Sequence, residues 1–271
     1  MEERIEVQAQ ILQEESEKNG KNKATKEEIN HIIRTISPGT NFRTALEGVV
    51  NAKKGAIIVV EIEGINSILD GGFKINSKFT PQKIVELSKM DGAITLSKDM
   101  KRITQANVMV YPDKKISTKE TGTRHRTAER TAKMMNTLVV TVSERRNEIT
   151  VYYKNFRHVV KNVNELLRKV NENLQILEKQ RELFDKNIEK LNRLELRNYL
   201  GLNQATQVIQ KGRLIQKIAN DLRKTIIELG NEGILLKIRL KELLSGVEKE
   251  TNLVIKDYTK IDLKKSKTLL E

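Results

Sequence analysis

Gly55-Ala56-Ile57-Ile58-Val59-Val60-Glu61 decides the fold, because its run of β-branched residues predicts a buried strand over residues 56–61. The same reasoning predicts strands over residues 93–96, 108–111, 138–142 and 149–153. Helices are expected up to residue 36, over residues 42–52 and 81–90, and after residue 122. Because strands and helices alternate, residues 27–154 are predicted to form an α/β domain with a mixed central sheet between helices.

Several of these helices carry local signals for where they begin. Thr25-Lys26-Glu27-Glu28 has the pattern of a capping box, and Thr80-Pro81 is an N-cap followed by the proline favoured in a first turn. The helix after Gly122-Thr123 has an apolar face formed by Ala128, Ala132 and Met135. These residues are expected to pack against the sheet.

After Asn155 the pattern changes to a heptad seam, which predicts a long helix that packs against other helices. The seam consists of Phe156, Val160, Val163, Leu167, Val170, Leu174, Leu177, Phe184, Ile188 and Leu191, and only Arg181 interrupts it. Its partners are either other chains or the helices expected after Gly201. Residues 155–271 are therefore predicted to form an all-α helical bundle or spine domain, and residues 1–26 an N-terminal extension.

The composition fits a folded protein that attracts polyanions. Of the 271 residues, 38% are hydrophobic and 32% are charged, and the formal net charge is +14. Nucleotides, nucleic acids and anionic surfaces are natural partners for such a charge, although a solvated basic surface explains it equally well. The sequence has no cysteine, no membrane-length apolar run and a charged amino terminus, so a cytoplasmic location and no membrane are expected.

Asp91 is the first candidate for chemistry, because it stands in Met90-Asp91-Gly92-Ala93-Ile94, directly before a predicted strand. Asp-Gly is a common turn dipeptide, and this simple interpretation is favoured when the motif is taken alone. The functional interpretation is a carboxylate that holds a divalent metal ion where glycine allows a substrate to approach closely.

Gly122-Thr123-Arg124-His125-Arg126-Thr127 is the stronger signal, because it places two guanidinium groups and an imidazole at the start of a helix. Free N–H groups and the helix dipole favour phosphate there, and arginine adds bidentate hydrogen bonds. The alternative is an exposed basic turn that pairs with Glu120 or Glu129. The residue chemistry alone leaves both interpretations open.

The remaining polar positions are less specific. Ser143-Glu144-Arg145-Arg146 follows a predicted strand and offers a hydroxyl group and positive charge, but strand-end turns often have this composition. His31 and His158 have no metal-ligand partner at a suitable spacing and are expected to be structural. No Gly-rich Walker loop and no zinc-binding spacing occur.

Residues 38–153 resemble the diadenylate cyclase domain of the bacterial DNA integrity scanning protein family. The block Glu120-Thr121-Gly122-Thr123-Arg124-His125-Arg126-Thr127-Ala128-Glu129-Arg130 is the most specific match. Other matching pieces are Pro38-Gly39-Thr40 with Arg43, Gly55-Ala56-Ile57-Ile58-Val59, Gly71-Gly72-Phe73, Lys89-Met90-Asp91-Gly92-Ala93-Ile94, Ala106-Asn107-Val108 and Ser143-Glu144-Arg145-Arg146. The helical region, with Leu229-Gly230-Asn231-Glu232-Gly233 and Asp257-Tyr258, resembles the linker domain of that family.

The resemblance implies an enzyme that condenses two ATP molecules into cyclic di-AMP and two pyrophosphates. Asp91 would hold Mg²⁺ or Mn²⁺ and activate the ribose 3′-hydroxyl, and Arg124, His125 and Arg126 would bind phosphates. ATP contacts are also implied for Gly92, Ala93, Thr123, Thr127, Ser143 and Arg146. Each protomer would hold one ATP in a site shared between two facing protomers, and the family's helical domain implies a homo-octamer.

Two departures from the family pattern and two alternative functions accompany this expectation. Residues 1–26 look like an addition, and the family's C-terminal helix-hairpin-helix domain is not recognised, so DNA binding is expected to be weak or absent. The main alternative is a non-catalytic, nucleotide-sensing helical scaffold that binds nucleic acid. The other is an ATPase or a different nucleotidyltransferase.

Overall fold

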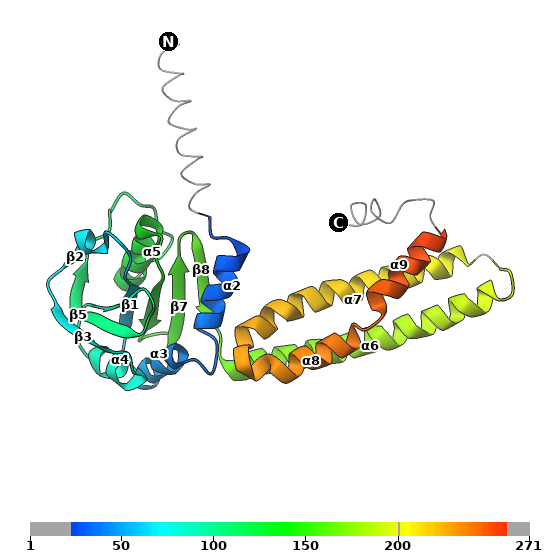
Figure 1. The fold of residues 1–271 in the computed structure, drawn as a ribbon, viewed down its shortest axis with the longest axis horizontal. Helices are drawn as coiled ribbons and strands as arrows, with labels where there is room; N and C mark the ends of the chain where they lie inside the picture. The colour runs from blue at the N-terminus through cyan, green and yellow to red at the C-terminus, as the bar shows by residue number, and fades with distance from the viewer. Residues whose placement is uncertain (1–22, 200, 259–271) are drawn as a thin grey trace, which may run out of the picture. The chain divides into compact units, whose positions relative to one another are not determined.

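The computed structural model describes residues 23–199 and 201–258, which form two compact units divided between residues 161 and 162 (Figure 1). The first unit is an α/β domain and the second is entirely helical. The predicted fold class, a mixed sheet with helices followed by a helical domain, is confirmed. The expected N-terminal extension lies almost entirely outside the described residues.

Strand β1 (Ala56–Val60) is at the centre of the sheet. It pairs in parallel with β4 (Ala93–Leu96) on one side and antiparallel with β6 (Val139–Ser143) on the other. The strand order is β2-β5-β4-β1-β6-β7-β8, and β3 also pairs with β5. The outer strands are β2 (Leu69–Asp70), β3 (Phe73–Lys78), β5 (Arg102–Val110), β7 (Glu148–Tyr153) and β8 (Phe156–Val160).

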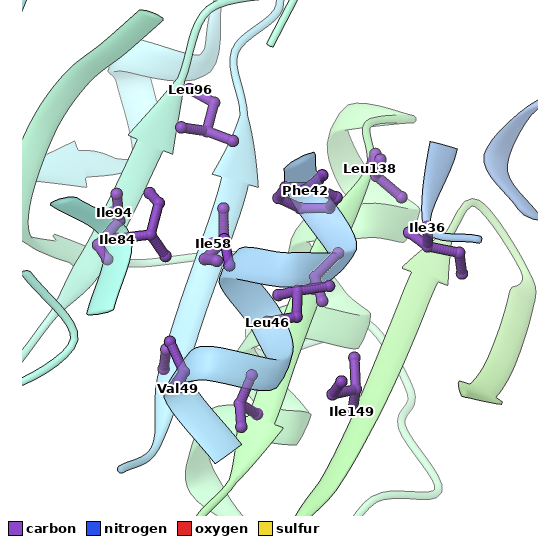
Figure 2. Packing of buried hydrophobic residues seen from close by; sticks show 14 of the residues in the cluster. Ile36, Phe42, Leu46, Val49, Ile58, Ile84, Ile94, Leu96, Leu138 and Ile149 are labelled. Atoms are coloured by element: carbon purple, nitrogen blue, oxygen red, sulfur yellow. The ribbon is translucent and has the colours of Figure 1, made fainter. Parts of the chain in front are cut away.

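Helices cover both faces of this sheet, which explains why β1 is apolar along its whole length. One core contains residues of α2 (Lys26–Thr35), α3 (Asn41–Asn51) and α4 (Pro81–Leu87). Figure 2 shows Leu46 and Val49 of α3 beside Ile58 of β1 within this core. On the other face, α5 (Thr123–Met135) packs on Ile57 and Val59 through the expected alanines, and the 3₁₀ helix η1 (Ile65–Ile68) joins this second core.

Most predicted elements of this unit are confirmed to within a few residues. The Thr25 capping box is present, and Thr80 caps α4, although α4 ends at Leu87 instead of residue 90. Strand β5 begins at Arg102, well before the predicted residue 108, because its first half is polar and lacks a continuous apolar signal. Strands β2 and β3 were not predicted, since both are largely exposed.

The expectation that the heptad seam starts at Phe156 is wrong. Residues Phe156–Val160 form β8, which pairs antiparallel with β7 at the edge of the sheet. Phe156 and Val160 match the heptad spacing, but their partners are in the sheet, since Phe156 lies opposite Tyr153. The long helix, α6 (Val163–Glu195), begins only after Asn162, whose side chain caps it.

The helical unit buries the rest of the seam within the same chain. Helix α6 packs along α7 (Leu202–Leu229), and the chain then continues through η2 (Gly230–Gly233), α8 (Ile234–Leu243) and α9 (Val247–Tyr258). The buried seam residues are Val170, Leu174, Leu177, Phe184 and Leu191, together with Leu166. Arg181, the interruption, donates hydrogen bonds to the carbonyl groups of Leu243 and Ser245 where α8 ends. No helix in the described ranges is long and apolar enough to cross a membrane.

Gly72 and Gly92 pack closely against β5 at a point where the register between β4 and β5 shifts. At this point Asn107 has a φ of 55°, a left-handed conformation that asparagine tolerates. A Cβ atom on Gly92 would lie 2.8 Å from the Asn107 carbonyl carbon, and one on Gly72 would lie 2.7 Å from the Ala106 carbonyl oxygen. Both glycines also have positive φ angles, so this contact requires glycine at both positions.

Gly92→Ala is therefore expected to destabilise the β4–β5 pair far more than Gly71→Ala, which is a matched control. Gly71 also has a positive φ, 66°, but a Cβ atom added there would meet no other atom within 4 Å. The left-handed backbone alone costs about 1–2 kcal/mol, and the steric overlap at Gly92 adds about 1–3 kcal/mol. Hydrogen exchange of the β4 amides measures the difference. Equal protection in the two variants would contradict this explanation.

Candidate functional site

The predicted site residues lie along the edge of the sheet that is formed by the ends of its strands, where β1 and β4 begin. Ile57 of β1 pairs with Ala93 of β4, so Asp91 and Gly92 stand just before the start of that pair. On the other side, Ala56 pairs with Val142, which places Ser143 at the same edge. The parallel and antiparallel neighbours of β1 thus bring two sequence-distant motifs together.

The amino end of α5 reaches this edge through Arg124. A Cβ atom on the buried Gly55, directly before β1, would lie 2.0 Å from Nη1 of Arg124. The guanidinium group therefore occupies the space that any other residue at position 55 would fill. Gly55 leaves room for Arg124 at this position, a contact that the sequence did not reveal because a glycine before a strand usually only ends a turn.

The guanidinium groups of Arg124 and Arg126 have no hydrogen bond or ion pair with any residue in the described part of the chain, and both side chains are exposed. The two carboxylates that the sequence offered as partners are bonded elsewhere. Glu120 accepts from Arg157, and Glu129 accepts from Lys133. The first turn of α5 contains no acidic residue and its N-cap, Gly122, supplies no side-chain hydrogen bond. The helix end therefore presents uncompensated positive charge, which favours an anion.

The other predicted site residues offer hydroxyl groups and one further cation, Arg146, which pairs with Glu148 at 3.8 Å. Thr123 and Thr127 are one turn apart on α5, so they lie on the same face. Ser143 Oγ accepts a hydrogen bond from the Arg146 N–H at 3.3 Å, and its own proton is left for another acceptor. Ala93 is buried in the core, so only its backbone can meet a ligand.

His125 differs from its two arginine neighbours because its ring is half-buried and bonded within the domain. Nδ1 lies 2.8 Å from the Tyr152 hydroxyl and 3.1 Å from Thr141 Oγ1. Burial lowers the pKa of His125 below its usual value, with Arg146 and Arg157 acting in the same direction against Glu120 and Glu148. Burial therefore favours the neutral form of the imidazole.

Asp91 fits a metal ion that completes its ligand set with substrate oxygens. The described residues contain no group of three or more acidic, histidine or cysteine side chains that could hold an ion by themselves. Asp91 is exposed, and its carboxylate has no partner among these residues. Mg²⁺ is commonly held by one or two carboxylates plus the phosphates of its substrate, and Mn²⁺ accepts the same oxygen ligands. One free carboxylate at the same strand ends as a helix terminus that favours an anion has this donor chemistry.

A cavity of about 570 Å³ lies at the opposite edge of the sheet and is lined in part by Val60, Glu61 and Leu138. None of the predicted site residues lines it. In contrast, Asp91, Thr123, Arg124, Arg126 and Arg146 are all exposed. The candidate site is therefore accessible to solvent at the amino ends of β1 and β4 and is separate from this cavity.

Sequence reasoning did not predict the contacts that the candidate site residues make with the rest of the domain. Asn107 lies under Gly92, and Tyr152, Thr141 and Arg157 form the surroundings of His125. Asparagine in a strand otherwise rich in β-branched residues is a weak signal for a left-handed kink. Tyr152 and Arg157 gave no signal, because alternating polar and apolar residues are ordinary in strands.

Both parts of the chain match one family. Residues 43–156 match the region described as DisA bacterial checkpoint controller nucleotide-binding, and residues 160–271 match the region described as DisA bacterial checkpoint controller linker. The first match contains every site residue named above, and the second covers the helical unit.

Individual relatives agree with this assignment. The DNA integrity scanning protein DisA of Clostridium kluyveri is 41% identical over 237 residues, which are 87% of this chain and 67% of that protein. The protein of the same name from Clostridium acetobutylicum is 40% identical and is covered to 66% of its length. That from Clostridium perfringens is 42% identical over 233 residues, which are 86% of this chain and 66% of the relative. The chain thus spans about two thirds of the length of these relatives. It belongs to the DisA bacterial checkpoint controller family, the diadenylate cyclase family expected from its sequence, and carries that family's nucleotide-binding and linker regions.

Proposed function

We propose that this chain is a diadenylate cyclase that condenses two ATP molecules into cyclic di-AMP and two pyrophosphates at a site shared between two facing protomers. The observation that carries the proposal is the pair of unpartnered guanidinium groups, Arg124 and Arg126, at the same sheet edge as the unpartnered Asp91 carboxylate. A triphosphate would pair with the two guanidinium groups, and its metal ion would pair with the Asp91 carboxylate. Family membership supports the same reaction.

The reaction consists of two equivalent phosphoryl transfers. In each one, the ribose 3′-oxygen of one ATP forms a bond to the α-phosphorus of the other, the bond to pyrophosphate breaks, and the 3′-hydroxyl loses its proton. Little covalent chemistry is required of the protein, so its contribution is positioning and charge stabilisation. When bound at Asp91, Mg²⁺ or Mn²⁺ would neutralise phosphate charge and favour ionisation of the hydroxyl group.

The named residues have distinct parts in this reaction. Arg124 and Arg126 donate hydrogen bonds to phosphate oxygens. The N–H groups of the first turn of α5 are further donors to the same oxygens. Thr123, Thr127 and Ser143 add hydroxyl contacts, Arg146 adds a further cation, and Gly92 and Ala93 offer backbone close to the nucleotide. His125 belongs to the same cluster but brings no positive charge at neutral pH, because burial keeps its pKa low.

The exposure of these groups supports a shared site. A single protomer leaves Asp91, Arg124 and Arg126 exposed to solvent, whereas phosphoryl transfer benefits from an environment that excludes water. Two copies facing each other through this surface would enclose two ATP molecules, and the isologous contact would make both bonds equivalent.

Asp91→Asn is expected to retain ATP binding and to lose cyclic di-AMP synthesis. The arginines still bind phosphate, but a neutral amide holds a divalent cation poorly and cannot accept the proton. ATP titration and mass detection of the product measure the two effects separately. A folded variant that makes cyclic di-AMP at the wild-type rate would refute the assignment of Asp91. If the wild-type chain binds ATP but forms no product, a nucleotide-sensing scaffold is the better description.

Arg124→Ala and Arg126→Ala are each expected to weaken ATP binding or turnover about tenfold or more, since a hydrogen bond to a charged group contributes about 1.5–3 kcal/mol. Arg→Lys at either position should restore only part of the loss, because an ammonium group cannot form the bidentate fork. Arg168→Ala is the matched control, as Arg168 is 76% exposed on α6 and lies outside the cyclase unit. If both site variants keep the wild-type ATP affinity and turnover rate, residues 122–127 form an exposed basic turn without a role in ATP binding.

Assembly beyond a dimer, to an octamer, is proposed to use the helical unit. The heptad seam is buried within the chain, so it leaves no apolar surface for this assembly. The proposal rests instead on an apolar surface on α8, formed by Ile234, Leu235 and Ile238, whose exposed fractions are 54%, 78% and 51%. Apolar side chains grouped on one short helix are typical of protein contacts.

The double substitution Leu235→Glu and Ile238→Glu is expected to lower the particle mass measured by light scattering, because two charges cannot be buried in an apolar contact. Lys224→Glu, at a residue that is 80% exposed on α7, is the control for added acidic charge and should keep the wild-type mass. A wild-type chain that is monomeric at micromolar concentration would rule out this assembly.

A further inference from the structure

His125 is the end of a line of contacts that crosses the sheet from its last strand. Arg157 of β8 donates to Glu120, Glu120 accepts from the Tyr152 hydroxyl at 3.0 Å, and that hydroxyl lies 2.8 Å from His125 Nδ1. Tyr152 is only 1% exposed, and its ring meets the imidazole edge to face. Four separate elements or segments of the chain thus determine the surroundings of one ring nitrogen.

The direction of each hydrogen bond follows from the charges. Burial opposes ionisation of Glu120, but hydrogen bonds from Arg157 and Tyr152 outweigh it and hold the pKa of this carboxyl group below its usual value. Burial and the bond to Glu120 raise the pKa of Tyr152, so the phenol keeps its proton. That single proton goes to the carboxylate. The phenolic oxygen is then an acceptor toward His125, and the proton between them must be on Nδ1.

Thr141 leads to the same assignment. Its hydroxyl oxygen lies 3.1 Å from Nδ1, and its own proton is directed to the Thr150 carbonyl oxygen at 3.4 Å. Both neighbours of Nδ1 therefore accept. A neutral ring that carries its proton on Nδ1 has an unprotonated Nε2, and Nε2 has no partner among the described residues. The adjoining carbon, Cδ2, lies 3.6 Å from the Cβ position of Gly122, so this side of the ring is next to the helix end that awaits the nucleotide.

We propose that Tyr152, held by Glu120 and Arg157, is a positioning residue that fixes the Nδ1–H tautomer of His125 and turns an unprotonated Nε2 toward the nucleotide. This inference rests on the proposed function for its consequence in catalysis. His125 then meets the nucleotide as a hydrogen-bond acceptor, suited to a hydroxyl group, whereas Arg124 and Arg126 meet it as cationic donors to phosphate. Of these three adjacent residues, the two arginines therefore donate hydrogen bonds to the nucleotide, and His125 accepts one.

The tautomer can be measured without any substrate. The chain has three histidines, so ¹⁵N NMR of the ring nitrogens can assign each of them. Free histidine prefers the proton on Nε2, and a neutral His125 with its proton on Nδ1 is therefore a distinctive result. Tyr152→Phe keeps the ring and removes the nearer of the two acceptors at Nδ1, so the His125 signals should move toward the Nε2–H form. Glu120→Gln should move the signals in the same direction, because the amide N–H donates to the Tyr152 oxygen and the Tyr152 hydroxyl then donates to Nδ1. This second variant serves if Tyr152→Phe folds poorly.

Tyr153→Phe is the matched control, because Tyr153 is adjacent on β7 and also donates to a carboxylate, Glu28, at 2.9 Å. It should leave the His125 signals and turnover unchanged. Tyr152→Phe should lower kcat about three- to tenfold, the value of one hydrogen bond, with a smaller change in KM for ATP. A wild-type His125 protonated on Nε2, or a wild-type kcat in both Tyr152→Phe and Glu120→Gln, would overturn the inference. If the wild-type chain makes no cyclic di-AMP, the proposed function fails, and the NMR result alone decides the tautomer.

Discussion

The pairing of β1 with a parallel neighbour on one side and an antiparallel neighbour on the other is the constraint on which the site depends. The parallel pairing places the start of β4, with Asp91 before it, beside the start of β1. The antiparallel pairing places the end of β6, with Ser143, at the same edge. Because α5 leads into β6, its amino end reaches that edge too, and Arg124 rests on Gly55. A one-residue slip of β1 would disturb every one of these contacts.

The site is defined by charges that the protein leaves without partners. Some basic residues elsewhere in the domain are bonded, as Lys133 is to Glu129 and Lys154 is to Glu28. Arg124 and Arg126 stand at the positive end of a helix with no such partner among the described residues. Uncompensated like charges at a helix end destabilise the free protein, and a bound anion would relieve this cost. The arrangement is thus one that ligand binding stabilises.

The sequence predicted the buried strands and the capped helices, because continuous β-branched runs and Thr25 or Thr80 caps are local signals. It failed where local and long-range patterns compete. Phe156 and Val160 continue the heptad spacing, but pairing with β7 takes them into the sheet. The charged candidate residues were proposed from residue chemistry and family resemblance. Gly55 and Asn107 stood only among the pieces that resemble the family, and Tyr152 and Arg157 were not singled out, because the contacts of all four depend on what lies against them in space.

The most direct test of the account is to incubate the full chain with ATP and Mg²⁺ or Mn²⁺ and to identify the products by mass. Two facing sites that each bind one ATP predict cyclic di-AMP, with two pyrophosphates released for every molecule formed. The rate should rise more steeply than linearly with protein at concentrations where the facing pair dissociates. ADP and phosphate as the products, or ATP left unchanged, would contradict it.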